Sequence, residues 1–252
     1  MNKSKDIVVG LGEIGKPLQK LFSKNTLVVG YDTNEKLMNN KKFQVVEKLN
    51  TRFLHVCIPF NTNFSKSVVD LIKKFNPECV IIHSTIKPNT TKKIQELVSI
   101  PVIYSPIRGV HKRMQFDLRR YTKFYAIGNN APRLRWAVKN YSCFLKECGI
   151  KTKRSSSPVT LELGKIICDT SYYGWLISYA QLSNLIAKNY NVKFDEMWEF
   201  SDEIHKYLGN RPKMFPGEIG GHCVLPNLDL IHNQTLDMIK KMNDTYIKSK
   251  KR

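Results

Sequence analysis

The residue pattern with the clearest chemical use is the glycine-rich loop Gly-Leu-Gly-Glu-Ile-Gly at positions 10–15. The loop follows an apolar run and opens an amphipathic segment, and Asp32 ends the next apolar run. In such a loop Gly10 permits a tight turn, Gly12 lets the backbone approach a pyrophosphate, and Gly15 allows close helix–strand packing. Asp32 can accept hydrogen bonds from ribose hydroxyls and would repel a 2′-phosphate, so the pattern predicts binding of NAD rather than NADP. The alternative is a turn in an α/β domain that binds no nucleotide.

The elements that must position this loop are short apolar runs that alternate with helical spacing. Strands are expected at 6–10, 26–31, 53–58, 79–83, 101–104 and 123–127, with helices between several of them, notably at 63–75 and 89–98. This alternation predicts an α/β fold with a doubly wound, mainly parallel sheet of the Rossmann type.

The pattern changes after a polar stretch at 151–158. Apolar residues at helical spacing predict one long helix from about 159 to 191, then helices at 194–208 and from Pro226 to about 248. We therefore expect a dinucleotide-binding domain over residues 1–154 and a helical domain, built on the long central helix, over residues 155–252.

Composition narrows the functional classes. The net charge of +20 would attract polyanions, but the basic residues are spread along the chain in short clusters, so we do not expect nucleic-acid binding; small anionic substrates fit the charge equally well. No apolar run approaches the roughly 20 residues that span a bilayer, and the chain start does not resemble a secretion signal. The six cysteines form no CxxC pairs, which predicts a cytoplasmic protein with neither disulfides nor a metal site.

Several further motifs carry a family resemblance. They are Val56-Cys57-Ile58-Pro59, His83-Ser84-Thr85, Ser105-Pro106, Glu162-Leu163-Gly164-Lys165 and Pro216-Gly217-Glu218-Ile219-Gly220-Gly221-His222-Cys223. With them the chain resembles the UDP-glucose/GDP-mannose dehydrogenase family, and more distantly the 6-phosphogluconate and hydroxyacid dehydrogenases. The last motif is the most specific, because the family's catalytic cysteine follows such a Gly-Gly pair. The resemblance covers the N-terminal and central domains of the family. The chain is too short to hold the family's C-terminal domain, which binds the nucleotide of the sugar substrate. We therefore expect that a partner subunit supplies this domain, that the substrate is not a nucleotide sugar, or that the activity has been lost.

The resemblance implies an NAD-dependent oxidoreductase, of the kind used in polysaccharide biosynthesis, that oxidises the alcohol of a sugar or nucleotide sugar. Cys223 matches the nucleophile that forms a thiohemiacetal and then a thioester, helped by backbone N–H groups that lower a thiol pKa. Lys165 matches the lysine that steadies the developing alkoxide. A structural cysteine and a solvent-facing lysine are the alternatives. The expected cofactor contacts are Gly10, Gly12, Glu13, Ile14, Gly15, Asp32, Pro59 and Thr85, and the expected substrate contacts are Arg108, His111, Gly220, Gly221 and His222.

The chain departs from the family at several of these positions. Asp169 stands where the family has Asn, and Asn227 stands where it usually has Asp, so the amide and the carboxylate have exchanged places. We hypothesise that Asp169 acts as the general base or orients water, while Asn227 only hydrogen-bonds. Ile107, Arg108 and His111 replace the family's carboxylates after Ser-Pro; Arg108 could clamp a carboxylate or phosphate and His111 could exchange protons. Both could equally be ordinary surface residues.

Two alternatives to the four-electron oxidation remain open. One is a two-electron, hydroxyacid-type oxidation that uses the lysine and needs no cysteine; the other is a non-catalytic NAD-binding protein derived from such an enzyme. The aromatic residues around the long helix also predict a homodimer through that helix, with burial under the 194–248 helices as the alternative.

Overall fold

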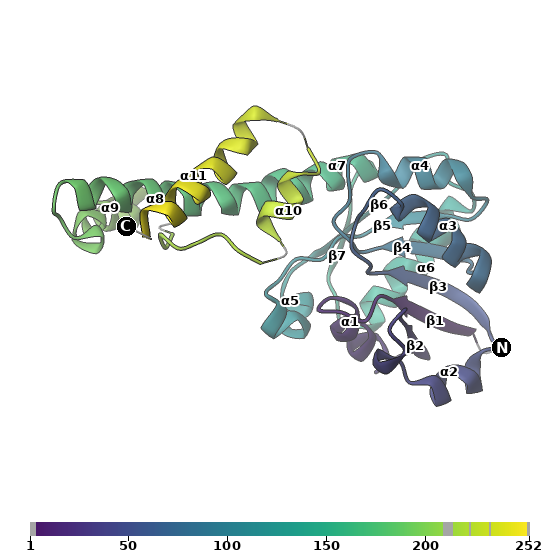
Figure 1. The fold of residues 1–252 in the computed structure, drawn as a ribbon. Coiled ribbons are helices and arrows are strands. Elements are labelled where there is room, and N and C mark those ends of the chain that lie inside the picture. Colours follow the sequence, from purple (N-terminus) through teal and green to yellow (C-terminus); the bar gives the residue numbers. More distant parts are fainter. Residues whose placement is uncertain (1–3, 209–213, 222, 232, 251–252) are drawn as a thin grey trace. The chain divides into compact units, whose positions relative to one another are not determined.

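The computed structural model describes residues 4–208, 214–221, 223–231 and 233–250. Contacts divide the chain into two compact units, Met1–Leu163 and Gly164–Arg252, whereas the expected boundary was between residues 154 and 155. The difference arises because a short helix at Pro158–Leu163 packs with the first unit. Each unit is described by itself below, with element labels as in Figure 1.

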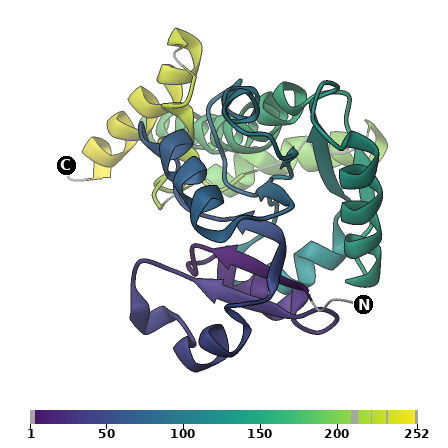
Figure 2. The same cartoon turned by 90° about the vertical axis from the view of Figure 1, so that its right-hand side faces the viewer.

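The first unit is built on one seven-stranded sheet with strand order β2-β1-β3-β4-β5-β6-β7. All pairs are parallel except β5 with β6, which confirms the expected Rossmann-type fold class. Figure 2 shows the purple β1 and β2 beside β3. The strands are β1 (Ser4–Val9), β2 (Val28–Tyr31), β3 (Asn50–Val56), β4 (Cys79–Ile82), β5 (Val102–Tyr104), β6 (Lys123–Ile127) and β7 (Thr152–Arg154).

Helices cover both faces of this sheet, which explains why its inner strands β4 and β5 are continuously apolar. On β1, Val8 joins the core that contains Phe22 and Phe144, while its neighbours Ile7 and Val9 join the opposite core. The helices are α1 (Gly15–Phe22), η1 (Glu35–Leu37), α2 (Asn40–Val46), α3 (Phe64–Phe75), α4 (Thr90–Leu97), η2 (His111–Arg113), α5 (Met114–Arg120), α6 (Leu134–Glu147) and α7 (Pro158–Leu163).

The second unit is helical. Its elements are the π-helical segment η3 (Gly164–Ser171), α8 (Tyr172–Asn189), α9 (Phe194–Leu208), α10 (Val224–Leu228) and α11 (Gln234–Lys250). Its core joins α8 to the last two helices through Ile177, Val224, Leu228 and Ile239. A side chain at Gly174 would bring its Cβ within 2.9 Å of Val224 Cγ1 and 3.3 Å of Ile239 Cγ2, so this glycine permits the close packing of α10 and α11 on α8.

The sequence-based expectations differ from the structure at several places. The helix expected from about 159 to 191 contains the π-helical segment η3 between α7 and α8. The single helix expected from Pro226 to about 248 is two helices, α10 and α11, separated by a turn. The polar stretch after residue 151 contains the edge strand β7, and α2, α5 and α6 were not among the helices named from the sequence. Within the described residues, no helix is both long and apolar enough to span a membrane.

Candidate cofactor and catalytic sites

The glycine loop lies between β1 and α1, at the carboxyl edge of the parallel strands. Gly10 has a φ of +87°, and a Cβ there would lie 2.8 Å from the carbonyl oxygen of Cys57. A Cβ on Gly15 would lie only 1.8 Å from the carbonyl oxygen of Gly10, so no side chain fits at the start of α1. Gly12 is exposed and no atom lies within 4 Å of its Cβ position, which leaves room for a ligand to reach the backbone. The loop therefore fits a pyrophosphate at the amino end of α1.

Asp32 follows β2 and closes the loop from the other side. Its Oδ2 accepts a hydrogen bond from the Leu11 N–H at 2.6 Å, and its Oδ1 accepts one from the Asn34 N–H at 2.9 Å. Each carboxylate oxygen has a second lone pair, so Asp32 retains acceptors for a ribose. A cavity of about 290 Å³ opens beside it, lined in part by Met38 and Phe43. This arrangement fits the adenosine half of NAD.

The other expected cofactor contacts lie on the loops that follow β3 and β4. The Ser84 hydroxyl donates to the carbonyl oxygen of Ile58 at 2.6 Å, which ties the loop of Thr85 to the loop of Pro59. Glu13 and Ile14 lie within the glycine loop itself, with Ile14 at the amino end of α1. These contacts remain predictions, since they depend on a bound cofactor.

Lys165 and Asp169 lie on the π-helical segment η3 of the second unit, and their side chains form an ion pair. The wider turn is visible where the Ser171 hydroxyl donates to the carbonyl oxygen of Ile166 at 2.7 Å, five residues earlier. Single π-turns inserted in helices often occur at functional sites. The Lys165 side chain is 15% exposed and that of Asp169 is 43% exposed, so the pair is reachable from solvent.

Cys223 is exposed and occupies the residue before α10, which packs against η3. Asn227 lies on α10, one turn further along. The structure thus brings together the two elements that carry the four expected catalytic residues. Because α10 has only five residues, we assign no large effect of its helix dipole to the Cys223 thiol. Gly220 has open space around it, Gly221 adopts a φ of +75°, and His222 lies outside the described residues.

A buried polar cluster that the sequence did not reveal holds the loop before Cys223. The Asn243 side chain accepts from the Ile219 N–H at 2.8 Å and donates to the Ile219 carbonyl at 3.1 Å. Gln181 Nε2 donates to the Gly217 carbonyl at 2.7 Å and to Asn243 Oδ1 at 3.1 Å, and the Tyr246 hydroxyl donates to the Pro216 carbonyl. Isolated Asn and Gln residues in a helix give no signal in a sequence, because only the fold shows what they face.

One of the two substrate residues expected in the first unit, Arg108, has structural partners, and its neighbour Ile107 is buried. Arg108 donates to the Thr122 carbonyl at 2.6 Å and lies 5.0 Å from the Phe124 ring centre. Ile107 is 5% exposed and belongs to the core. The backbone of His111 is in η2, but its side chain lies outside the described part of the structure.

Glu162 is a further residue whose position the sequence could not give. Its buried carboxylate accepts from the N–H groups of Asn89 and Thr91 at 2.6 and 2.9 Å and from the Thr91 hydroxyl at 2.6 Å. It therefore caps the amino end of α4 and fastens α7 to the sheet domain. Burial raises the pKa of Glu162, and these hydrogen bonds oppose the shift.

The larger of the two described cavities, about 490 Å³, lies between α4 and α7, where Gln95 and Val159 line it. It contains none of the residues expected to bind cofactor or substrate. Among the residues that the structure describes, no group of three or more His, Cys, Asp or Glu side chains could hold a metal ion.

Comparison with known proteins supports a likeness to nucleotide-sugar dehydrogenases. No family model matches the chain. A UDP-N-acetyl-D-mannosamine dehydrogenase of Methanococcus maripaludis is 26% identical over 262 aligned residues, which cover 86% of this chain and 58% of that protein. The chain thus spans little more than half the length of this curated relative.

Solved structures support the fold assignment. The structure of a UDP-D-ManNAc dehydrogenase from Pyrococcus horikoshii matches with a TM-score of 0.77 and 18% identity over 96% of this chain and 68% of the other. A 3-hydroxyisobutyrate dehydrogenase from Mycobacterium tuberculosis matches with a TM-score of 0.69 and 14% identity over 98% and 93% of the two chains. At these identities the likeness concerns the fold.

Proposed function

We propose that this chain is an NAD-dependent dehydrogenase that oxidises the alcohol of a sugar-type substrate, with a nucleotide sugar as the first substrate class to test. One observation carries the proposal: α10, preceded by Cys223, packs on the π-helical segment that holds Lys165 and Asp169 as an ion pair. A nucleophile, a cation and a carboxylate on two packed elements are the groups that alcohol and aldehyde oxidation needs. The sequence similarity to a UDP-N-acetyl-D-mannosamine dehydrogenase supports the substrate class.

In the proposed reaction, NAD held by the glycine loop and Asp32 would supply the acceptor for the hydride of the carbinol carbon. Lys165 stabilises the alkoxide as the alcohol gives up its proton, and Asp169 holds the lysine and receives or relays that proton. The Cys223 thiol then adds to the aldehyde to give a thiohemiacetal, whose oxidation by a second NAD leaves a thioester. Water breaks the thioester into a carboxylic acid and the free thiol, so each substrate molecule reduces two NAD.

The experiment is a count of NADH released per molecule of substrate consumed. UDP-N-acetylmannosamine, UDP-glucose, sugar acids and small hydroxy acids would be offered in turn, with product identified by mass spectrometry. Two NADH and an acid product support the cysteine route. No NADH with any of them, together with tight NAD binding, would indicate the non-catalytic alternative and contradict the proposal.

A two-electron oxidation is the second candidate, and the burial of Ile107 favours it. The family resemblance places hydrolysis-assisting carboxylates after Ser-Pro, and here that neighbourhood begins with an apolar side chain packed into the core. An enzyme without those acids can still transfer one hydride with Lys165 alone. One NADH per substrate and an aldehyde or ketone product, unchanged in Cys223→Ser, would support this candidate.

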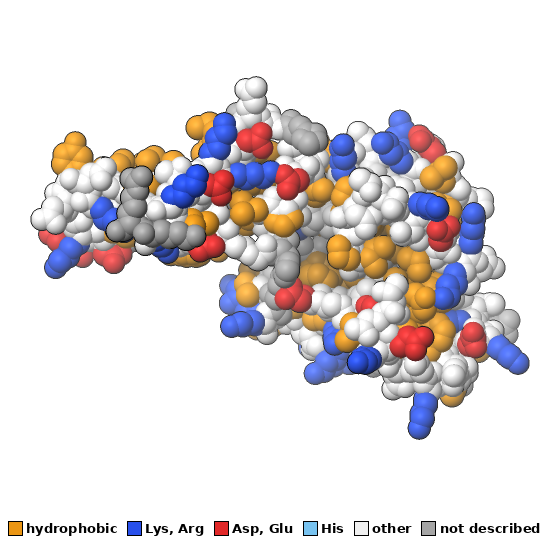
Figure 3. Space-filling model, in the orientation of Figure 1, with side chains coloured by type: hydrophobic (Ala, Val, Ile, Leu, Met, Phe, Trp, Pro, Cys, Tyr) orange, Lys and Arg blue, Asp and Glu red, His pale blue; other side chains and the backbone are white. Residues whose placement is uncertain are grey.

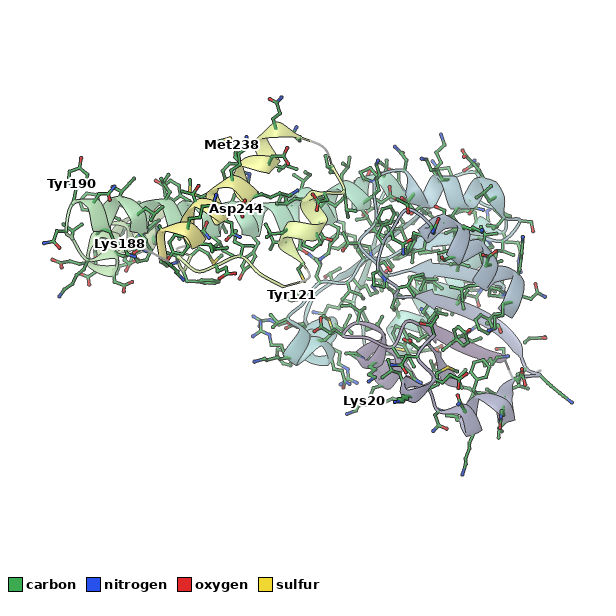
Figure 4. The ribbon with its side chains drawn as sticks, in the orientation of Figure 1. Lys20, Tyr121, Lys188, Tyr190, Met238 and Asp244 are labelled. Atoms are coloured by element: carbon green, nitrogen blue, oxygen red, sulfur yellow. The ribbon has the colours of Figure 1, made fainter. Side chains whose placement is uncertain are left out.

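We further propose that the chain forms a homodimer through α8. Tyr172, Tyr179 and Ile186 recur every seven residues and are 53%, 62% and 45% exposed, so they form one apolar stripe along that helix. Figure 3 shows orange side chains along the upper edge of α8, and Tyr190, which follows α8, points into solvent in Figure 4. A second copy would cover the stripe.

We also propose that the protein lies in the reducing cytoplasm, because its six cysteines form no CxxC pairs.

A further inference from the structure

A buried lysine lies at the edge of the sheet where the cofactor is proposed to bind. Lys123 is 5% exposed and begins β6. Since β6 is antiparallel to β5, its first residue lies at the edge where the parallel strands end. That topology alone brings a lysine side chain to the carboxyl edge of β3, β4 and β5.

Lys123 holds the loop that follows β5. Its Nζ donates to the carbonyl oxygens of Ser105 at 2.8 Å and Pro106 at 3.2 Å. The Ser105 hydroxyl donates to the Phe124 carbonyl at 2.9 Å, which fixes the same loop from β6. The ammonium group of Lys123 therefore holds the Ser-Pro turn through two backbone carbonyls.

Two buried histidines extend this cluster, and their protonation follows from geometry. His83 Nδ1 lies 2.9 Å from the Ser105 carbonyl oxygen, which can only accept, so Nδ1 carries the proton. Neutral His83 then accepts at Nε2 from His55 Nδ1, 3.0 Å away. His55 is neutral because burial lowers the pKa of its imidazole to about 3, so its Nε2, which has no hydrogen-bond partner in the described structure, carries no proton.

Both imidazoles are thus neutral, and the positive charge of the cluster comes from Lys123. Burial and the charges of Arg52 and Lys123 lower the pKa of His55 to about 3, while burial and Lys123 hold the pKa of His83 well below its usual value. Arg52 itself is paired with Asp6, with nitrogen–oxygen distances of 3.0 and 2.6 Å. Burial raises the pKa of Cys57 to about 12, and the charge of Lys123 opposes that shift, so its field reaches the loop after β3.

The direction of the cofactor places this charge at its nicotinamide end. Asp32 after β2 marks the adenosine side and the loop after β1 marks the pyrophosphate, so an extended dinucleotide continues toward β3 and β4. The carbonyl of Cys57, which packs on Gly10, joins that path to the cluster.

We propose that Lys123 is a positioning residue for the nicotinamide half of the cofactor, and that its buried charge makes the site favour NADH over NAD⁺. The nicotinamide ring is cationic in NAD⁺ and neutral in NADH, so a fixed positive charge nearby penalises only the oxidised form. A site that binds the reduced form more tightly favours the transfer of a hydride to the cofactor. This inference rests on the proposed NAD-dependent function.

The test measures the dissociation constants of NAD⁺ and NADH separately, without substrate, by calorimetry and NADH fluorescence. In the wild type we expect NADH to bind about tenfold more tightly than NAD⁺, the size expected of one charge in a partly buried site. Lys123→Gln keeps an N–H donor for the Ser105 carbonyl and removes the charge, so NAD⁺ and NADH should then bind about equally. Lys123→Met should give the same ratio, and Lys123→Arg should keep that of the wild type.

Three results would overturn the inference. Wild-type protein that binds NAD⁺ as tightly as NADH lacks the proposed bias, whether or not any variant folds. Equal losses of both affinities in the folded glutamine variant would reduce Lys123 to a structural role. Wild-type protein that binds neither form contradicts the proposed function as well, which separates the two failures.

Discussion

At the scale of single residues, the glycine loop shows how two glycines serve different ends. Gly15 has no room for a side chain because of the Gly10 carbonyl, whereas Gly12 has open space where a ligand would approach. Gly15→Ala should displace the loop, lowering both the thermal midpoint and NADH affinity. Gly12→Ala is the matched variant: we expect an unchanged midpoint and an affinity loss on the order of tenfold or more. NADH titration and thermal unfolding of both variants would check this, and unchanged binding in Gly12→Ala would contradict it.

Asp169 provides the second prediction at this scale. Asp169→Asn removes the charge that faces Lys165, so turnover should fall by about a hundredfold if the carboxylate moves a proton. The thermal midpoint should change little, because exposed ion pairs contribute little to stability. Glu203→Gln, which breaks the exposed pair with Lys206 on α9, is the control and should leave turnover unchanged. Full turnover in Asp169→Asn would refute the role that we assign to this residue.

At the scale of elements, the pair formed by His55 of β3 and His83, which follows β4, makes the stability depend on pH. Because the pKa of His55 falls from its ordinary 6.5 to about 3 in the folded protein, the unfolded chain binds a proton that the native one does not. Its contribution is therefore complete above about pH 6.5 and is lost as the pH falls toward 3, by about 1.4 kcal/mol per pH unit.

Unfolding in urea between pH 7 and pH 5 measures this slope. In His55→Phe the new ring can pack against the neighbouring Phe22 and Phe144. The variant should reduce the slope of the unfolding free energy against pH by the amount that corresponds to about one proton. An identical slope in the variant would show that His55 is protonated in the folded state.

The conformation of the loop before Cys223 depends on polar side chains of α8 and α11. Asn243→Leu would leave both backbone groups of Ile219 without their partners, at a cost of about 2 kcal/mol or more. We expect faster proteolysis of residues 214–221 and faster alkylation of Cys223, while NADH affinity, a property of the other unit, stays the same. Unchanged alkylation would mean that the cluster does not control the loop.

At the scale of the whole molecule, the apolar stripe on α8 makes the assembly testable. Tyr179→Glu places a charge in the middle of the stripe, so the dissociation constant of the dimer should rise at least about 30-fold. Leu97→Glu alters an equally exposed apolar residue of the first unit and should leave the assembly unchanged. Sedimentation velocity over a range of concentrations distinguishes the outcomes, and a monomeric wild type would contradict the proposed dimer.

The sequence by itself determined the glycine loop, the positions of β1 to β6 along the chain and the presence of a long helix. These features depend on local physics: glycine spacing, apolar runs of strand length and the 3.6-residue period of a helix. Lys165, Asp169 and Cys223 were singled out by the family resemblance, which rests on short motifs that can be matched in the sequence. The break in the last helix could not be predicted, because it depends on how α10 packs against η3 and against Ile177 of α8.

Only the tertiary structure decided which polar residues are buried together. Lys123 looks like any basic residue at the start of a strand, and it reaches Ser105 because β6 runs antiparallel to β5. In the sequence Asn243 and Gln181 look like ordinary helix residues, and only the fold brings them together beside the loop before Cys223. The cost of burying an unpaired polar group depends on neighbours that are distant in the sequence, so residue spacing alone carries no signal of these clusters.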